Sequence, residues 1–239
     1  MLDFSQNQKQ FQKLTKPKAI IFDWDNTLVD TWPLIQLAIN STMEKFNRQP
    51  WSLQQVRDNI HKSMRDSFPE IFQQDWQQAG EIYRQSYQAI NLNEIKFLAH
   101  SLDLIKTINQ LNIKQFVVSN KIGLTLRKEI KKLAVEQYFF SMIGAFDANN
   151  DKPSSDPVEL ALLGSEIDLK NDVIWFIGDT IADVECAYNS NCQPIIYGHS
   201  GNQVSKTISD EIIKNGFKNN QIIPVYFDHL ELINLLKNL

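Results

Sequence analysis

Short apolar runs, each followed by small, polar or acidic residues, constrain the fold of this chain more than any other feature. They occupy residues 18–22, 114–118, 173–177 and 193–197. Runs of about four to eight apolar residues are typical of strands buried on both faces, as in the middle of a parallel sheet. Amphipathic helical patterns lie between them, for example at residues 101–111 and 124–133. Alternating strands and helices predict an α/β protein with a parallel sheet.

Residues 30–98 interrupt this alternation, because they contain no convincing strand. Pro33 opens a helical pattern there, and later segments of the insertion are rich in aromatic residues. Aromatic stripes are more often core than ligand site. We therefore predict two units, an α/β core formed by residues 1–29 and 99–239 and a helical subdomain with its own core at 30–98.

Composition excludes several classes of protein. The chain has 239 residues, of which 43% are hydrophobic, and its 24 basic residues do not outnumber its 28 acidic ones. This balance argues against nucleic acid as a partner. The absence of a signal-like start and of any run near about 20 apolar residues predicts a cytoplasmic protein without membrane contact. Cys186 and Cys192 form no CxxC pattern and are expected to be reduced, buried thiols.

Two pairs of aspartates follow apolar runs. Asp23 and Asp25 leave the first run, and residues two apart in an extended chain project to the same side. Asp179 and Asp183 leave the third run, four residues apart at a predicted helix start. Open parallel sheets bind ligands at this carboxyl edge. Carboxylates gathered there would repel one another without a cation, and Mg²⁺ fits best because it combines a few carboxylates with water and phosphate.

Polar residues at two further positions suit a phosphoryl group. Ser119 and Asn120 follow the second run, and Lys152 precedes a predicted helix. A hydroxyl, backbone N–H groups and an ammonium are what the spread negative charge of a phosphoryl group requires. Singly, each of these residues is typical of a turn or of a solvated charge, so the prediction depends on the combination.

Together these segments resemble the four motifs of the haloacid dehalogenase (HAD) superfamily. The motifs are Asp23-x-Asp25-x-Thr27, Ser119 after a strand, Lys152, and Gly178-Asp179-x-x-x-Asp183. The form Ser119-Asn120-Lys121 and the helical insertion resemble the phosphoglycolate phosphatase-like branch. The resemblance covers about residues 18–239 and implies a Rossmann-like core with an inserted helical cap.

The resemblance also implies roles for these residues. Asp23 would be the nucleophile that forms an aspartyl-phosphate, and Asp25 the general acid and base. Mg²⁺ would be held by Asp23, the main-chain carbonyl of Asp25, and Asp179, with Asp183 joining or orienting that shell. The phosphoryl oxygens would be bound by Ser119, Asn120 and Lys152. The expected partner is a small phosphate ester, and the chain would act as a monomer or homodimer.

Two other functions remain open at this point. A sugar-phosphate mutase would keep all four motifs, and a non-catalytic HAD-like module could bind a protein through its cap. Response-regulator receivers and dehalogenases fit less well, because of the order of the motifs and the presence of Asp25 and Asp179. In the cap, Lys62 and Arg65 are candidates for pairing with a substrate carboxylate, as a phosphoglycolate-like ester would require. Solvent exposure is the alternative interpretation for both.

Overall fold

The centre of the molecule is a six-stranded parallel sheet. The computed structural model describes residues 14–60, 63–90, 94–198 and 223–239. The strand order is β5-β4-β1-β6-β7-β8. These strands are β1 (Ala19–Phe22), β4 (Lys114–Ile122), β5 (Ser141–Ala145), β6 (Ile174–Gly178), β7 (Gln193–Tyr197) and β8 (Val225–Tyr226). A second, antiparallel sheet pairs β2 (Val29–Asp30) with β3 (Lys96–Phe97).

The described helices divide between the insertion and the core. Those of the insertion are α2 (Trp32–Lys45), α3 (Leu53–Asn59), α4 (Met64–Phe72), η1 (Gln73–Asp75) and α5 (Trp76–Ala89). Those of the core are α6 (Ser101–Gln110), α7 (Gly123–Lys132), η3 (Glu136–Tyr138), α8 (Asp156–Leu162), α9 (Ile181–Asn189) and α11 (His229–Asn238).

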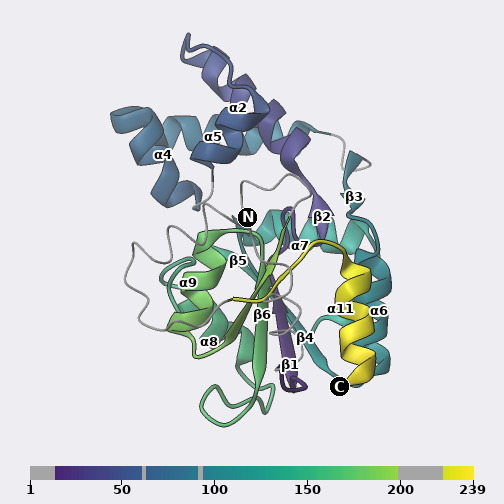
Figure 1. Cartoon of the computed structure of the whole chain (residues 1–239). Coiled ribbons are helices and arrows are strands. Elements are labelled where there is room, and N and C mark those ends of the chain that lie inside the picture. Colours follow the sequence, from purple (N-terminus) through teal and green to yellow (C-terminus); the bar gives the residue numbers. More distant parts are fainter. Residues whose placement is uncertain (1–13, 61–62, 91–93, 199–222) are drawn as a thin grey trace.

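Both faces of the sheet are covered by helices. Along β1 every side chain is fully buried. Ile20 and Phe22 belong to the same apolar cluster as residues of α6 and α11, whereas Ala19 and Ile21 pack with residues of α8 and α9. Figure 1 shows these two helix pairs on opposite sides of the sheet. This two-sided burial explains why β1 is a continuous apolar run and not an alternating one.

The predicted α/β class and the four predicted strands are confirmed. β5 was not predicted, because its sequence Ser-Met-Ile-Gly-Ala is too short and too small in its side chains to give an apolar run. It forms by pairing with β4, where Phe116 lies opposite Ser141. Cys186 and Cys192 are buried and free, as predicted.

The helices of the insertion form a cap above the carboxyl edge of the sheet (Figure 1). The chain enters the cap through β2 and leaves it through β3, and Asp30 pairs with Lys96 in this ribbon. The cap does not have the separate core that the sequence predicts. Its buried residues, such as Ile39 and Phe68, belong to the same apolar cluster as Ile20 and Phe22 on one face of the sheet. We retain residues 30–98 as the proposed cap subdomain.

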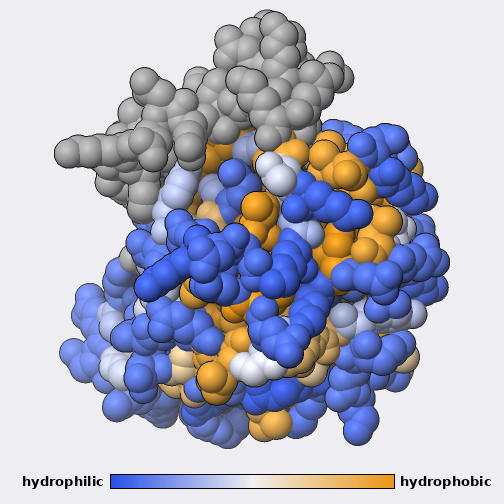
Figure 2. Space-filling view, turned by 90° about the horizontal axis from the view of Figure 1, so that it is seen from below, coloured by the Kyte–Doolittle hydropathy of each residue, from blue (hydrophilic) through white to orange (hydrophobic). Residues whose placement is uncertain are grey.

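The surface away from the cap is mostly hydrophilic, and the hydrophobic side chains on it are interrupted by polar ones (Figure 2). Among the described helices, none has the length and apolar character needed to cross a membrane.

Candidate active site

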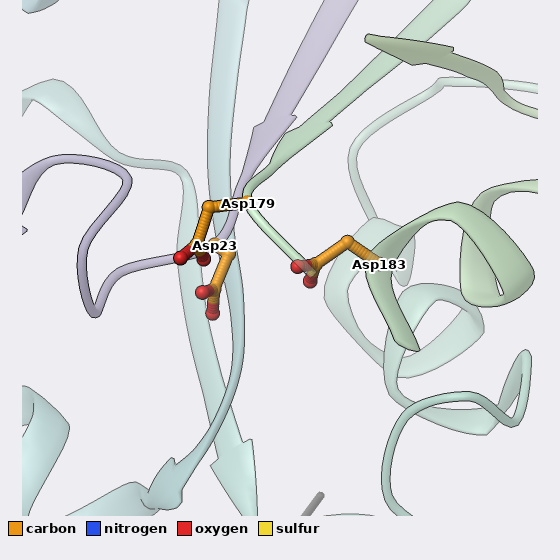
Figure 3. Close-up of side chains that lie close together, drawn as sticks. All are labelled: Asp23, Asp179 and Asp183. Atoms are coloured by element: carbon orange, nitrogen blue, oxygen red, sulfur yellow. The ribbon is translucent and has the colours of Figure 1, made fainter. Parts of the chain in front are cut away.

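Three acidic side chains meet at the carboxyl edge of the sheet. Asp23 directly follows β1, Asp179 directly follows β6, and Asp183 lies in the first turn of α9. One oxygen from each carboxylate lies within 4.8 Å of the other two, and all three residues are buried. In Figure 3, Asp23 and Asp179 lie side by side and Asp183 points toward them from α9. The sequence predicted that these three aspartates would gather at this edge together with Asp25, and Asp25 is not in the group.

The register of the sheet produces this convergence. Phe22, the last residue of β1, lies opposite Ile177 of β6 and Val117 of β4, so β1 and β6 end at nearly the same level while β4 continues to Ile122. The Asp23 amide then donates to the carbonyl of Ile177 at 2.8 Å, which fixes the backbone of the first motif against β6. Because the neighbours of β1 come from distant parts of the sequence, β1 lies at a topological switch point, where open α/β sheets bind ligands.

Lys152 lies among these carboxylates. Its Nζ is 2.8 Å from Oδ1 of Asp23 and 2.6 Å from Oδ1 of Asp183, and its side chain is buried. Burial alone would lower the pKa of Lys152, but the carboxylates of Asp183 and Asp23 outweigh it and raise that pKa. The ammonium is therefore a permanent positive charge beside Asp23.

One ammonium does not neutralise three carboxylates, so the remaining negative charge of the site favours binding of a further cation. Its donors are all carboxylate oxygens, which suit a hard divalent ion such as Mg²⁺ and not a soft metal. Asp23, Asp179 and Asp183 therefore fit Mg²⁺ by charge and by ligand type.

Asp183 is held in place by the start of its own helix. Its Oδ2 accepts hydrogen bonds from the Thr180 amide at 2.9 Å and from Thr180 Oγ1 at 2.7 Å, and together these residues form a capping box. Gly178 allows this arrangement, because a Cβ at that position would overlap the Asp183 side chain.

We therefore expect Gly178→Ala to displace Asp183 and to weaken Mg²⁺ activation by about ten- to hundredfold, as loss of an orienting group at a metal site does. The measurement is activity against Mg²⁺ concentration, with circular dichroism as the check on folding. Gly80→Ala is the control, because its added methyl would meet the flexible Met64 side chain at 3.3 Å and the Phe68 ring at an ordinary contact distance of 3.9 Å. An unchanged Mg²⁺ requirement in Gly178→Ala would contradict the role given to Asp183.

The environment of Asp23 favours its protonated form when no metal is bound. Burial raises the pKa of this carboxyl from 3.8 to about 8; Lys152 opposes the shift, and Asp183 and Asp179 add to it. A folded-state pKa above the unfolded one means that the native state binds the proton more tightly. The resulting stabilisation is present in full below about pH 4 and is lost as pH rises through about 8.

Metal-free protein should therefore lose stability from this group between about pH 4 and about pH 8, by at most about 1.4 kcal/mol per pH unit. Asp23→Asn should remove that slope, since the amide does not titrate. Denaturant unfolding of both proteins in EDTA at several pH values measures the difference. Identical slopes would show that Asp23 does not titrate in this range.

Ser119 and Asn120, near the end of β4, lie beside Lys152. Asn120 Nδ2 donates to the Lys152 carbonyl at 3.2 Å, which ties the second predicted motif to the third. Asn120 Oδ1 is buried without a hydrogen-bond partner in the described part of the chain. Ser119 Oγ accepts from the Lys121 amide at 3.3 Å.

A cavity of about 120 Å³ lies between the cap and the sheet edge. Its core side is lined by Asp23, Asp25, Ser119, Asn120, Lys152 and Asp179. Its cap side is largely apolar and aromatic, and includes Trp32, Phe68, Tyr83 and Tyr87, with Arg84 as a charged member. Asp183 is not among the lining residues, but it forms an ion pair with Lys152, which lines the cavity.

Comparison with known proteins agrees with this geometry. The sequence profile of the haloacid dehalogenase-like hydrolases matches residues 20–197, which include all four motifs. The chain belongs to this family. The family predicted from the motifs is thus confirmed.

Curated relatives of this HAD hydrolase carry two kinds of name. It is 22% identical to the pyrophosphatase PpaX of Halalkalibacterium halodurans, over 76% of this chain and 84% of the relative. It is 27% identical to a phosphoglycolate phosphatase of Aquifex aeolicus, over 70% of this chain and 78% of the relative. Among solved structures, a HAD-superfamily hydrolase from Ehrlichia chaffeensis matches with a TM-score of 0.62 and 26% identity, over 95% of this chain and 98% of that one.

The Asp25 carboxylate of this HAD hydrolase lines the cavity but is not part of the acidic cluster. Its Oδ1 accepts from Thr31 Oγ1 at 2.6 Å and lies 2.9 Å from Lys121 Nζ. Asn26, which adopts a positive φ of 58°, accepts from the Thr31 and Trp32 amides at the start of α2. The first motif is thus joined directly to the first cap helix.

Of the two predicted specificity residues, Lys62 lies outside the described residues and Arg65 binds the core. The Arg65 guanidinium donates to both carboxylate oxygens of Asp151 at 2.5 Å and to the Asn149 carbonyl at 3.0 Å. It also lies over the Phe146 ring, 4.5 Å from the centroid. Arg65 does not line the cavity. This HAD hydrolase therefore uses Arg65 to join α4 to the loop before Lys152. Among the described residues of the cap, the cation that lines the cavity is Arg84.

The sequence interpretation gave no role to Lys121, Glu129 or Tyr87, which form a buried polar group beside Asp25. One signal was available for Glu129. Leu126, Ile130 and Leu133 lie on one apolar stripe of the predicted helix, and Glu129 falls on that stripe where an apolar residue is expected.

Proposed function

We propose that the protein is a Mg²⁺-dependent phosphatase that hydrolyses small phosphomonoesters through an aspartyl-phosphate on Asp23. The observation that carries this proposal is the convergence of Asp23, Asp179 and Asp183, with Lys152 paired to Asp23 and Asp183, beside a cavity between the cap and the sheet. Membership of the HAD hydrolases and relatives named as phosphatases support it.

In the first step an oxygen of Asp23 attacks phosphorus, and the bond between phosphorus and the ester oxygen breaks. Asp25 donates a proton to the departing alkoxide. In the second step Asp25 takes a proton from water, the water oxygen bonds to phosphorus, and the bond from phosphorus to Asp23 breaks. The products are the alcohol and inorganic phosphate, and both carboxylates return to their starting state.

The chain's own residues supply most of what these steps need. Lys152 beside Asp23 would bind a transferring phosphoryl oxygen, together with Ser119 and Asn120. Mg²⁺ held by Asp23, Asp179 and Asp183 would offset the repulsion between the nucleophilic carboxylate and a dianionic phosphate. The main-chain carbonyl of Asp25 is proposed as a further ligand.

Substrate choice is assigned to the cap, because the core residues contact only the phosphoryl group. Arg84 at the cavity could pair with an anionic leaving group, because its ion pair with Glu81 of the same helix is exposed, whereas Arg65 is bound to the buried Asp151. Both phosphoglycolate-like esters and pyrophosphate therefore belong in a substrate panel.

The test is phosphate release from p-nitrophenyl phosphate and from a panel of metabolite phosphates, with Mg²⁺ and with EDTA. We expect release that depends on Mg²⁺ and stops with EDTA. Product analysis separates the mutase, which would return an isomerised sugar phosphate in place of free phosphate. A folded protein that releases phosphate from no ester would favour the non-catalytic binding module.

A further inference from the structure

A buried polar cluster, separate from the acidic site, connects Asp25 to the cap. We call Lys121, Glu129 and Tyr87 the Lys121 cluster. Lys121 Nζ lies 2.9 Å from Asp25 Oδ1, 2.9 Å from Glu129 Oε1 and 2.7 Å from the Tyr87 hydroxyl. The Tyr87 hydroxyl in turn donates to Glu129 Oε1 at 2.9 Å.

Lys121 lines the cavity, but its ammonium already has three partners. It donates hydrogen bonds to Glu129 Oε1 and the Tyr87 hydroxyl and forms an ion pair with Asp25, and its side chain is only 6% exposed. Lys121 therefore acts on Asp25 and not on the substrate.

Glu129 forms a buried ion pair with this ammonium. It is fully buried on α7, and its second oxygen accepts from Trp24 Nε1 at 2.8 Å. Trp24 lies between Asp23 and Asp25 in the chain, so Glu129 is bonded both to the first motif and to the lysine that holds Asp25. Burying a carboxylate costs free energy that an apolar residue at this place would not cost. Stability alone therefore does not explain Glu129, whereas a requirement for fixed geometry does.

Tyr87 brings the cap into the same cluster. It lies near the end of α5, is buried, and is bonded to both charged members of the cluster. The other partner of Asp25 Oδ1 is Thr31, at the start of α2. One partner of the Asp25 carboxylate, Thr31, thus lies at the start of the cap. The other, Lys121 of β4, is hydrogen-bonded to Tyr87 of the cap.

From this geometry we infer that Lys121, Glu129 and Tyr87 are positioning residues that hold the Asp25 carboxylate ready for proton transfer while the cap is docked. This inference rests on the proposed function. It predicts that damage to the cluster impairs proton donation to the leaving group and leaves attack on phosphorus largely intact.

Two substrates of nearly the same shape separate these effects. Phenyl phosphate releases a basic phenolate that needs a proton, and p-nitrophenyl phosphate releases a weakly basic one that does not. The quantity compared is the ratio of kcat/KM for phenyl phosphate to kcat/KM for p-nitrophenyl phosphate, because kcat/KM includes the step in which the leaving group departs. A residue needed only for folding would lower both values equally.

The variants are Tyr87→Phe, which removes one hydroxyl, and Lys121→Met/Glu129→Gln, which removes both buried charges together so that neither is left unpaired. Removing both is safer for folding than removing one. General acid catalysis contributes about 10²–10⁴-fold, so we expect the ratio to fall by about threefold or more in Tyr87→Phe and by about thirtyfold or more in the double variant. Tyr138→Phe is the control, because Tyr138 packs against the core and does not line the cavity.

An unchanged ratio in both variants, with active wild-type protein, overturns this inference alone. An increase in KM with the ratio preserved also overturns it, because that result would make the cluster a substrate-binding group. A wild-type protein that hydrolyses neither ester overturns the proposed function and this inference with it.

Discussion

Asp23→Asn is expected to lower kcat by about four orders of magnitude or more, because the amide nearly preserves the shape of the side chain but is not a nucleophile. The Asp23 carboxylate lies 2.8 Å from Lys152 and lines the cavity, whereas Asp183, the other carboxylate beside Lys152, does not line it and so could not replace Asp23. The measurement is phosphate release from p-nitrophenyl phosphate under saturating substrate and Mg²⁺.

The matched control is Asp103→Asn, at an exposed position of α6 that does not line the cavity. Asp103→Asn should keep the wild-type rate. If a folded Asp23→Asn protein retained a rate within tenfold of the wild type, Asp23 could not be the group that receives the phosphoryl.

Lys152→Met is expected to have the second largest effect, on both stability and activity. The substitution leaves Asp23 and Asp183 buried without the ammonium that lies between them. Removal of one partner from a buried ion pair typically costs about 3–5 kcal/mol. Loss of a cation that stabilises a transferring phosphoryl group should lower kcat by about 10²–10³-fold.

Mg²⁺ gives this prediction a second, independent readout. A divalent ion bound to the same carboxylates would replace part of the missing positive charge, so added Mg²⁺ should stabilise Lys152→Met more than it stabilises the wild type. Denaturant unfolding with and without Mg²⁺ measures this difference. Lys152→Arg is the control, because it changes the side chain but keeps the positive charge. Equal stabilisation of Lys152→Met and wild type by Mg²⁺ would argue against a shared site.

The sequence was informative where local pattern decides structure. The run at residues 18–22 predicted β1, and the positions of Asp23 and Asp179 after two such runs predicted their convergence, because parallel strands share a carboxyl edge. Lys152 was predicted from its charge in combination with Ser119 and Asn120, and from the resemblance to a family motif. Its contact with Asp23 joins residues 129 positions apart, and no local rule produces it.

The contacts between cap and core could not be predicted in the same way. Arg65 and Asp151 are 86 positions apart, and both are common as solvated charges on a surface. Their pairing depends on how the cap is seated over the sheet, which hydrophobic periodicity does not encode. The Lys121 cluster was missed for the same reason, since Tyr87, Lys121 and Glu129 come from two helices and a strand.

The central claim is that a phosphoryl group is transferred to Asp23, and one experiment tests it directly. In Asp25→Asn the first step can proceed with p-nitrophenyl phosphate, whose leaving group needs no proton, but water attack in the second step lacks its base. The protein is mixed with this ester and Mg²⁺, quenched in acid, digested, and analysed by mass spectrometry. We predict that the peptide containing Asp23 carries the mass of one phosphoryl group. Release of p-nitrophenol in a burst while that peptide stays unmodified would contradict the account.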